Sequence, residues 1–347
     1  MSLPHLTRET LRVQAAAQLA AAAATTGGLF AVNKPPGISC AGLIDYIKRN
    51  AGLNENALPF SEHFERERVL RETGKKIFRI KYPTNMRVGH AGTLDVEASG
   101  VLVLGVESGC KRLDGYLKGE KSYMATGRLG VATDTYDAEG KVTRVGDASA
   151  VTSDMLLDAI PAFVGSIEQI PPMYSAIRID GKRLYEYMRS GQPLPFKIKP
   201  RTVHISDIRL LYYHPQGAMA LQRPVYGKRV MLPKDCAEHF ASGRFAWDES
   251  SRGSKGLAIG DHMYSFVNQP DSALFQVLVR SGSGVYIRSL INDMGELLGC
   301  GAAMAMLVRT SQGSLRLGRD TIEVQSLPYV AEIVSAMRRT QVRMEES

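Results

Sequence analysis

The 347-residue sequence has little of what builds metal centres or disulfide frameworks. Its seven histidines show no i,i+3 or i,i+4 pairing, so histidine spacing predicts no metal site. Its four cysteines form no CxxC pair, and no secretory signal accompanies them. This scatter is typical of reduced, buried thiols rather than of disulfides or zinc ligands. The four are Cys40, Cys110, Cys236 and Cys300.

The sequence also has no long hydrophobic run. No apolar stretch reaches the roughly 18 residues of a candidate membrane span, and the alanine-rich N-terminal tract is too weakly apolar to be one. The Gly-x-x-x-x-Gly-Lys-Ser/Thr loop of P-loop NTPases is missing. The paired Asp-Thr/Ser-Gly motifs of an aspartic protease are missing too. We therefore expect no membrane partner, and neither of these enzyme classes fits.

What is present is the composition of an ordinary soluble globular protein, 44% hydrophobic and 22% charged. The length suffices for one large domain or two ordinary ones. A net charge of +8 at pH 7 favours a polyanionic partner, although many basic proteins bind none. Strand and helix patterns alternate without repeating a βαβ unit, which favours an α+β domain around a largely antiparallel sheet.

The ends of the chain differ from its middle. We expect an N-terminal extension at residues 1–27, in which Thr7 caps a helix running to about Ala24. Its composition resembles a mitochondrial transit peptide, and the alternatives are a frayed extension or a helix packed on the domain. The main domain covers residues 28–330, and residues 331–347 are expected to be a C-terminal tail.

Two segments of the main domain lose periodicity and are expected to be insertions. The first, at about 53–86, is rich in basic residues and stands immediately before Arg87 and His90. Its basic residues either form a solvated face or bind phosphates. The second, at about 217–270, gathers glycine, proline and serine. The basic residues within the first insertion are Arg66, Arg68, Arg71, Lys75, Lys76, Arg79 and Lys81.

Other segments carry plain secondary-structure signals. Ser39 predicts the cap of an amphipathic helix that follows it. Residues 123–131 and 274–280 predict strands, and residues 152–165 predict a helix ending near its glycine. Apolar spacing predicts a further helix over 287–298, with an arginine in its first turn that lies off the apolar stripe.

The most informative segment is Arg87-Val-Gly-His-Ala-Gly-Thr-Leu-Asp95, followed by Val-Glu-Ala-Ser-Gly-Val-Leu-Val-Leu-Gly105. The apolar run at 101–104 predicts a strand buried on both faces. Asp95 therefore lies on a loop beside rigid scaffold, where the neighbouring glycines permit close approach of a ligand. Spacing alone leaves open an ordinary glycine-rich turn capped by an aspartate.

A resemblance favours the functional interpretation of this segment. Gly-His-Ala-Gly-Thr-Leu-Asp95 resembles the catalytic motif GHxGxLD of TruB-type tRNA pseudouridine synthases. Five further blocks resemble this family in its order, so that roughly residues 28–315 are covered. The chain looks like the eukaryotic tRNA pseudouridine-55 synthases without a PUA domain, because only about thirty residues follow Leu315. The five blocks are Gly28–Ser39, Lys121–Gly140, Gln169–Ala176, Gly181–Gly191 and Gly284–Ala302.

The resemblance implies the pseudouridine synthase fold, an α+β fold with a mixed, largely antiparallel sheet, flanking helices and a central active-site cleft. It implies an enzyme that isomerises uridine to pseudouridine at position 55 in the T-loop of tRNA. The implied partner is tRNA through its T-stem-loop, other RNAs with a similar loop are further candidates, and we expect a monomer. Because the isomerisation needs no oxidant or group donor, we expect no cofactor and no metal.

The resemblance also implies the site residues. Asp95 is the catalytic carboxylate, as a nucleophile or as a base in an elimination route. Tyr123 stacks on the target base, and Arg288 pairs with Asp95 and keeps it ionised. His90 takes the space that the flipped nucleotide vacates. The uracil pocket is lined or shaped by Tyr286, Leu307, Lys34 and Pro35.

Two departures from the family pattern bear on these expectations. Val96 and Glu97 replace the usual proline and apolar residue after the aspartate, so we expect a looser turn. Asn33 stands where an acidic residue commonly precedes Lys-Pro. The competing hypothesis is an RNA-binding or ribosome-assembly factor of the same fold, with catalysis secondary or absent. The presence of all three implied catalytic residues, Asp95, Tyr123 and Arg288, argues against it.

Overall fold

The computed structural model describes residues 7–73, 85–175, 178–179, 182–184, 187, 198–215 and 273–346. These residues form two compact units. The first takes its described residues from 7–73, 85–120 and 308–346, and the second from 121–215 and 273–307. Strand β12 (Ala302–Gln312) has residues in both units. The insertion predicted at 217–270 lies outside the described residues.

The sheet of the first unit is built around β3 (Ser99–Val106), which is buried except at its first residue. Strand β3 pairs antiparallel with β1 (Leu29–Lys34) and β2 (Val88–His90), and parallel with the last part of β12. Strand β1 pairs parallel with β14 (Thr321–Ile322), and β13 (Leu315–Arg316) pairs antiparallel with β12. The apolar run of β3 is therefore a strand buried on both faces, as predicted.

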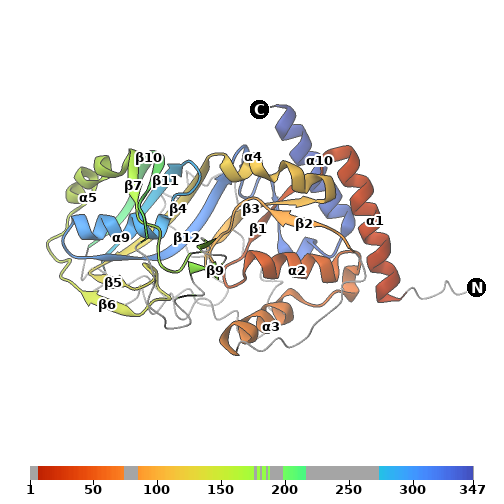
Figure 1. Ribbon diagram of the computed structural model, residues 1–347, viewed down its shortest axis with the longest axis horizontal. Helices are drawn as coiled ribbons and strands as arrows, with labels where there is room; N and C mark the ends of the chain where they lie inside the picture. Colours follow the sequence, from red (N-terminus) through yellow and green to blue (C-terminus); the bar gives the residue numbers. More distant parts are fainter. Residues whose placement is uncertain are drawn as a thin grey trace, which may run out of the picture. The chain divides into compact units, whose positions relative to one another are not determined.

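Several helices surround this sheet (Figure 1). The helices are α1 (Arg8–Thr26), α2 (Cys40–Asn50), α3 (Phe60–Thr73), α4 (Leu113–Lys118) and α10 (Val330–Glu345). The short 3-10 helices are η1 (Asn54–Asn56), η2 (Glu107–Arg112) and η5 (Val324–Ser326).

Helices α1 and α10 pack against each other. Helix α1 is capped at its start by Thr7, whose hydroxyl accepts a hydrogen bond from the N–H of Thr10, and at its end by Gly27 with φ +78°. It buries four residues and packs against α10 (Figure 1). Residues 8–26 of the N-terminal segment thus form a packed helix. Of the residues predicted as a tail, 331–345 belong to the packed helix α10.

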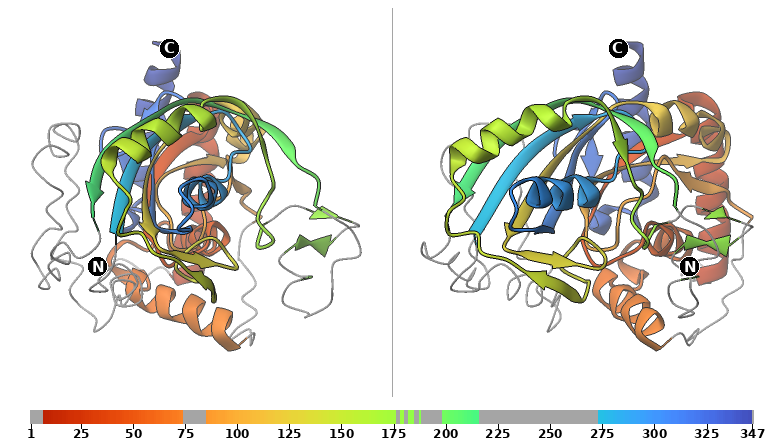
Figure 2. Two further views of the ribbon diagram at one scale, coloured as in Figure 1. Left: turned by 90° about the vertical axis from the view of Figure 1, so that its left-hand side faces the viewer. Right: turned by 60° about the vertical axis from the view of Figure 1, so that its left-hand side comes forward.

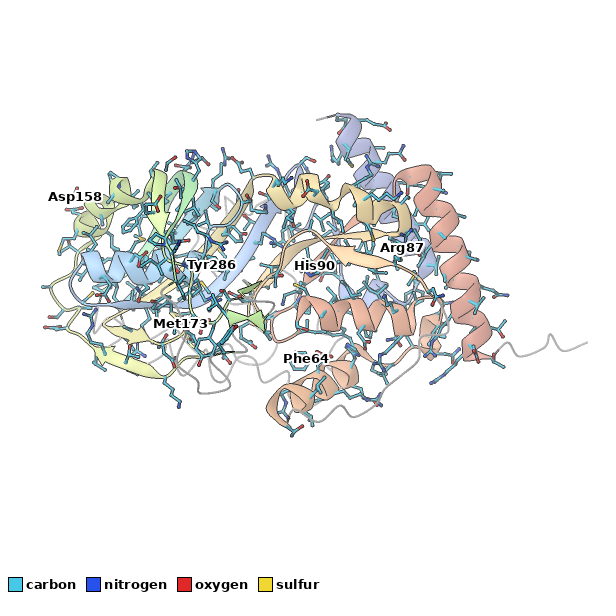
Figure 3. All side chains as sticks on the ribbon, viewed as in Figure 1. Phe64, Arg87, His90, Asp158, Met173 and Tyr286 are labelled. Carbon is cyan, nitrogen blue, oxygen red and sulfur yellow. The ribbon has the colours of Figure 1, made fainter. Side chains whose placement is uncertain are left out.

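Helix α2 begins at Ser39, as predicted, because the Ser39 hydroxyl accepts a hydrogen bond from the N–H of Gly42. Helix α3 lies within the first predicted insertion and packs against α2. His63 Nε2 lies 2.9 Å from the carbonyl oxygen of Gly42, and Phe64, labelled in Figure 3, is buried. The part of this insertion at 74–84 lies outside the described residues.

In the second unit four strands pair antiparallel in the order β4, β11, β10 and β7. Helix α9 lies on the concave side of these curved strands, and α5 lies on the opposite side (Figure 2). These elements are β4 (Lys121–Leu129), β7 (Gly165–Gln169), β10 (Arg201–His214), β11 (Ala273–Ser281), α5 (Ser153–Ala159) and α9 (Ile287–Leu297). The smaller elements are β5 (Val131–Thr133), β6 (Val142–Val145), η3 (Ile160–Phe163), β8 (Arg178–Ile179) and β9 (Lys182–Arg183).

The sequence predictions for this unit are largely confirmed. The strands expected at 123–131 and 274–280 and the helix expected over 287–298 are present. The helix expected over 152–165 is shorter, because a 3-10 turn carrying Pro161 replaces its second half.

Both units combine helices with mainly antiparallel strands, so the predicted α+β class is confirmed. Within the described part of the chain, no helix has the length and hydropathy to cross a membrane.

Candidate active site

The candidate catalytic aspartate lies in the first unit on residues 91–98, which we call the Asp95 loop. The loop connects β2 to β3. At its start the N–H of Ala91 donates to the carbonyl of Val103 at 2.9 Å, and at its end the N–H of Ala98 donates to the carbonyl of Asp95 at 3.2 Å. The side chain of Asp95 is half-buried. The carboxylate therefore stands on a short turn anchored to the buried strand β3.

Lys34, the last residue of β1, is fully buried beside this loop. Its ammonium donates to three backbone carbonyls, those of Pro35 at 2.9 Å, Ile38 at 2.8 Å and Val96 at 3.0 Å. Pro35 is buried as well. The three donors of an ammonium thus find three acceptors, which is what a buried polar group requires. Lys34 therefore ties the turn after β1 to the Asp95 loop.

The turn after Asp95 is held through the backbone of Val96. The carbonyl of Val96 accepts hydrogen bonds both from Lys34 and from the N–H of Gly37, the latter at 2.8 Å. Whether this turn is looser than that of relatives, because Val96 and Glu97 replace the usual residues, stays a prediction. Backbone acceptance by Val96 fixes the turn without a proline.

The second departure from the family pattern is also explained. The side-chain amide of Asn33 donates to both carboxylate oxygens of Glu323, at 3.0 and 3.1 Å. An acidic group therefore lies beside Asn33, supplied by a residue 290 positions later in the chain.

Burial gives Lys34 a pH-dependent contribution to stability. Desolvation lowers the pKa of its ammonium from 10.5 to about 8, although Cys40, Glu97 and Asp95 act in the opposite direction. Between these two pKa values the unfolded chain binds more protons than the folded chain, so the free energy of unfolding rises with pH. We expect the wild type to gain up to about 3 kcal/mol relative to Lys34→Met across this window. Denaturant unfolding at several pH values measures the difference, and a flat difference would contradict the assignment.

His90 ends strand β2 and is labelled in Figure 3. Burial lowers the pKa of its imidazole, a hydrogen bond with the backbone of Gly92 partly offsets this, and the charge of Arg309 lowers it further. Its Nδ1 is buried, and no residue described here offers it a hydrogen-bond partner. Burial beside the Asp95 loop thus disfavours the protonated form of this ring.

In the second unit, Arg288 lies in the first turn of α9, as predicted, but it is buried. Its Nη1 donates to the carbonyl of Thr135 at 3.0 Å, and its Nη2 donates to the carbonyl of Tyr174 at 3.1 Å. Nη1 also lies 3.4 Å from the carboxylate of Asp137. That carboxylate accepts hydrogen bonds from the hydroxyl of Thr135 at 2.5 Å and the N–H of Glu139 at 3.1 Å. The guanidinium is therefore fixed by two backbone carbonyls and one carboxylate.

Tyr286, labelled in Figure 3, immediately precedes α9 and is half-buried. The buried side-chain amide of Gln169 forms two hydrogen bonds with the backbone of Tyr286. Gln169 Nε2 donates to the Tyr286 carbonyl at 3.0 Å, and the Tyr286 N–H donates to Gln169 Oε1 at 2.8 Å. The hydroxyl of Ser289 donates to the carbonyl of Ile170 at 3.2 Å. These contacts fix the start of α9, and with it the backbone that carries Arg288.

The other two predicted residues of this unit are largely buried. Tyr123, on β4, is 9% exposed and pairs with Val279 of β11, and Leu307, on β12, is 7% exposed. Their packing is that of core side chains, so their contact with substrate stays a prediction.

The structure thus places the predicted residues in two groups, one in each unit. Lys34, Pro35 and His90 surround the Asp95 loop, while Tyr123, Tyr286, Leu307 and Arg288 belong to the second unit. The pairing of Arg288 with Asp95 stays a prediction. The sequence argument missed Gln169 and Asp137, although both stand in the matched blocks. Among the described residues no cluster of potential metal ligands occurs.

Two family models match this chain. The TruB family pseudouridylate synthase N-terminal domain matches residues 75–224, and the tRNA pseudouridylate synthase B C-terminal domain matches residues 288–333. The tRNA pseudouridine synthase 4 of Schizosaccharomyces pombe is 32% identical over 331 residues, covering 84% of this chain and 80% of that protein. The chain belongs to the TruB family of pseudouridylate synthases.

A further relative and one solved structure are also similar to this chain. Pseudouridylate synthase TRUB1 of Mus musculus is 31% identical over 307 residues, covering 88% of this chain and 69% of that protein. A chain in the crystal structure of a Cbf5-Nop10-Gar1 complex aligns with 94% of this chain and 60% of its own length, with a TM-score of 0.46 and 20% identity. Membership of the TruB family makes this chain a pseudouridine synthase, an isomerase that works as an intramolecular transferase. Asp95 and Arg288 fall within the two matched segments.

Proposed function

We propose that this TruB-family enzyme isomerises uridine 55 in the T-loop of tRNA, with Asp95 as its catalytic carboxylate. The observation that carries the proposal is the Asp95 loop, which presents a half-buried carboxylate on a turn fixed by β3 and Lys34. The names of the relatives, tRNA pseudouridine synthase 4 among them, support tRNA as the substrate. Other RNAs with a similar loop are further candidate substrates.

The reaction breaks the N1–C1′ bond of uridine, turns the freed uracil and forms a C5–C1′ bond. N1 gains a proton and C5 loses one, so atoms and electrons balance without an oxidant, a reductant or a group donor. Neither a cofactor nor a metal is therefore proposed. Asp95 acts either as a nucleophile or as a base in an elimination route, and both roles require an ionised carboxylate.

The base must leave its stack before this chemistry can occur, at a cost of a few kcal/mol. Stacking on an aromatic ring recovers about 1–3 kcal/mol of that cost. We assign this contact to Tyr123, with Tyr286 and Leu307 lining the uracil pocket. The two hydrogen bonds from Gln169 support the assignment of Tyr286, because they fix the backbone of an aromatic residue that is only half-buried.

Arg288 is proposed to keep Asp95 ionised and oriented, as the family resemblance implies. Its bonds to Thr135 and Tyr174 and its proximity to Asp137 leave the guanidinium little freedom. A preorganised cation of this kind stabilises charge in the reaction without reorganising.

The basic residues of the first insertion give weaker support for phosphate binding. In α3, Arg66 pairs with Glu62 at 2.5 Å and Arg68 pairs with Glu65 at 2.8 Å. Such exposed pairs contribute about 0–1 kcal/mol and belong to a solvated helix face. Those two arginines are therefore not assigned to RNA, and Lys75, Lys76, Arg79 and Lys81 lie outside the described residues.

The experiment that tests the proposed function compares two T-stem-loop RNAs that differ only at position 55. Wild-type protein should form pseudouridine in the uridine RNA in the presence of EDTA, and should bind the cytidine RNA without forming product. Binding of both RNAs with no isomerisation, there or in whole tRNA, would favour the competing RNA-binding or assembly-factor hypothesis.

A further inference from the structure

The most unusual buried group in the first unit is Arg309, on β12. Among the described residues its side chain is the largest that is fully buried, with 1% exposed. Charged residues are seldom buried completely unless they are paired. Yet no carboxylate among the described residues pairs with Arg309, and its hydrogen bonds go to backbone carbonyls instead. A cation retained at such a cost needs an explanation.

The partners of Arg309 lie in or beside the Asp95 loop. Its Nε donates to the carbonyl of Val101 in β3 at 2.6 Å, and its Nη2 donates to the carbonyl of Gly92 at 3.3 Å. Gly92 has φ +102°, a backbone conformation that favours glycine. One planar group therefore ties the loop to the strand that follows it.

Gln312, three residues further along β12, acts beside it. This amide is fully buried, and its Nε2 donates to the carbonyl of Ala91 and to that of Tyr116, the latter at 3.3 Å. Its Oε1 accepts the N–H of Val103 at 3.4 Å. Two side chains of β12 thus hold the consecutive carbonyls of Ala91 and Gly92.

The backbone from which Arg309 extends is itself fixed. Arg309 pairs with Gly100 of β3, and a side chain at Gly100 would lie 2.2 Å from the Arg309 carbonyl oxygen. This close approach sets the reach of the guanidinium. At the other end of the loop, Lys34 holds the carbonyl of Val96, the residue after Asp95.

We propose that Arg309 is a positioning residue for the reaction, which with Gln312 fixes the start of the Asp95 loop and thereby the place of the catalytic carboxylate. This inference rests on the proposed role of Asp95. Holding a reacting group in place accounts for much of enzymatic rate, and a displacement of about 1 Å can cost about 100-fold. A lysine keeps the charge but lacks the planar fork that reaches two carbonyls at once.

The test compares Arg309→Met and Arg309→Lys with the matched control Val308→Ala. Val308 is the buried neighbour on the same strand, and its truncation lowers stability without removing a hydrogen bond to the loop. Three quantities are measured for each variant: kcat and KM on a T-stem-loop RNA, the thermal midpoint, and amide hydrogen exchange of residues 91–98.

We expect Arg309→Met to lower kcat by about 100-fold or more while KM changes by less than about threefold. Hydrogen exchange in the Asp95 loop should become faster, and Arg309→Lys should restore only part of kcat. Val308→Ala should lower the thermal midpoint but keep kcat within about threefold and leave loop exchange unchanged.

The proposal is overturned if Arg309→Met keeps the wild-type kcat and loop exchange. It is also overturned if Val308→Ala loses kcat to the same degree, since general destabilisation would then suffice. Should Arg309→Met fail to fold, Arg309→Lys decides by the same readouts. Asp95→Asn in the same assay separates the catalytic role of Asp95 from the positioning role of Arg309. If Asp95→Asn remains active, the role proposed for Asp95 is wrong. Hydrogen exchange of the Asp95 loop in the Arg309 variants still shows whether Arg309 positions the loop.

Discussion

Asp95→Asn is expected to abolish pseudouridine formation and to leave affinity for a T-stem-loop RNA within about tenfold, or 1.4 kcal/mol. The change keeps the size of the side chain but removes the anionic oxygen that either mechanism requires. The loop itself should persist, because its fixed points are backbone carbonyls held by Lys34, Arg309 and Gln312. Single-turnover product formation beside filter binding measures both quantities.

The matched control for this variant is Glu97→Gln, the same change of carboxylate to amide two residues away in the same loop. Glu97 is half-buried like Asp95, so the two substitutions disturb similar surroundings. Glu97→Gln should form product at close to the wild-type rate. Product formation by Asp95→Asn at the wild-type rate would show that the catalytic residue is misassigned.

Arg288→Lys is expected to lower the rate of product formation by about 100-fold or more. Lysine keeps the positive charge, but a single ammonium cannot reproduce the geometry in which Nη1 and Nη2 donate to the carbonyls of Thr135 and Tyr174. The loss should appear in the single-turnover rate rather than in RNA affinity, because Arg288 is buried and does not belong to the exposed basic surface.

Arg280→Lys serves as the control in the same unit, because Arg280 is an exposed arginine at the end of β11. It should leave the single-turnover rate near the wild-type value. Equal rates for Arg288→Lys and Arg280→Lys would mean that the guanidinium of Arg288 has no special role in the reaction.

Much of the scaffold could be predicted from local sequence signals. The apolar run of β3, the Ser39 cap of α2 and the apolar spacing of α9 each depend on neighbouring residues, so they are visible in the sequence. Helix α3 was missed because glutamates and arginines alternate along it and few of its residues are buried. Helix α10 was missed because its buried face is complete only against α1 and β1.

The polar contacts that position the site could not be predicted in the same way. Gln169 and Tyr286 are 117 residues apart, and Arg309 and Gly92 are 217 apart. No local pattern distinguishes a glutamine or arginine that will be buried against a distant backbone from one on the surface. The resemblance pointed to Asp95 and Arg288. The side chains that hold the backbone around these two residues could be identified only from the structure.

The most direct test of the central claim is a map of pseudouridine at single-nucleotide resolution in total RNA. The RNA comes from cells that lack this gene and from the same cells expressing either the wild-type chain or Asp95→Asn. We predict that pseudouridine at position 55 of tRNA T-loops returns with the wild-type chain and stays absent with Asp95→Asn. No return with the wild-type chain, or equal return with both chains, would contradict the proposed function.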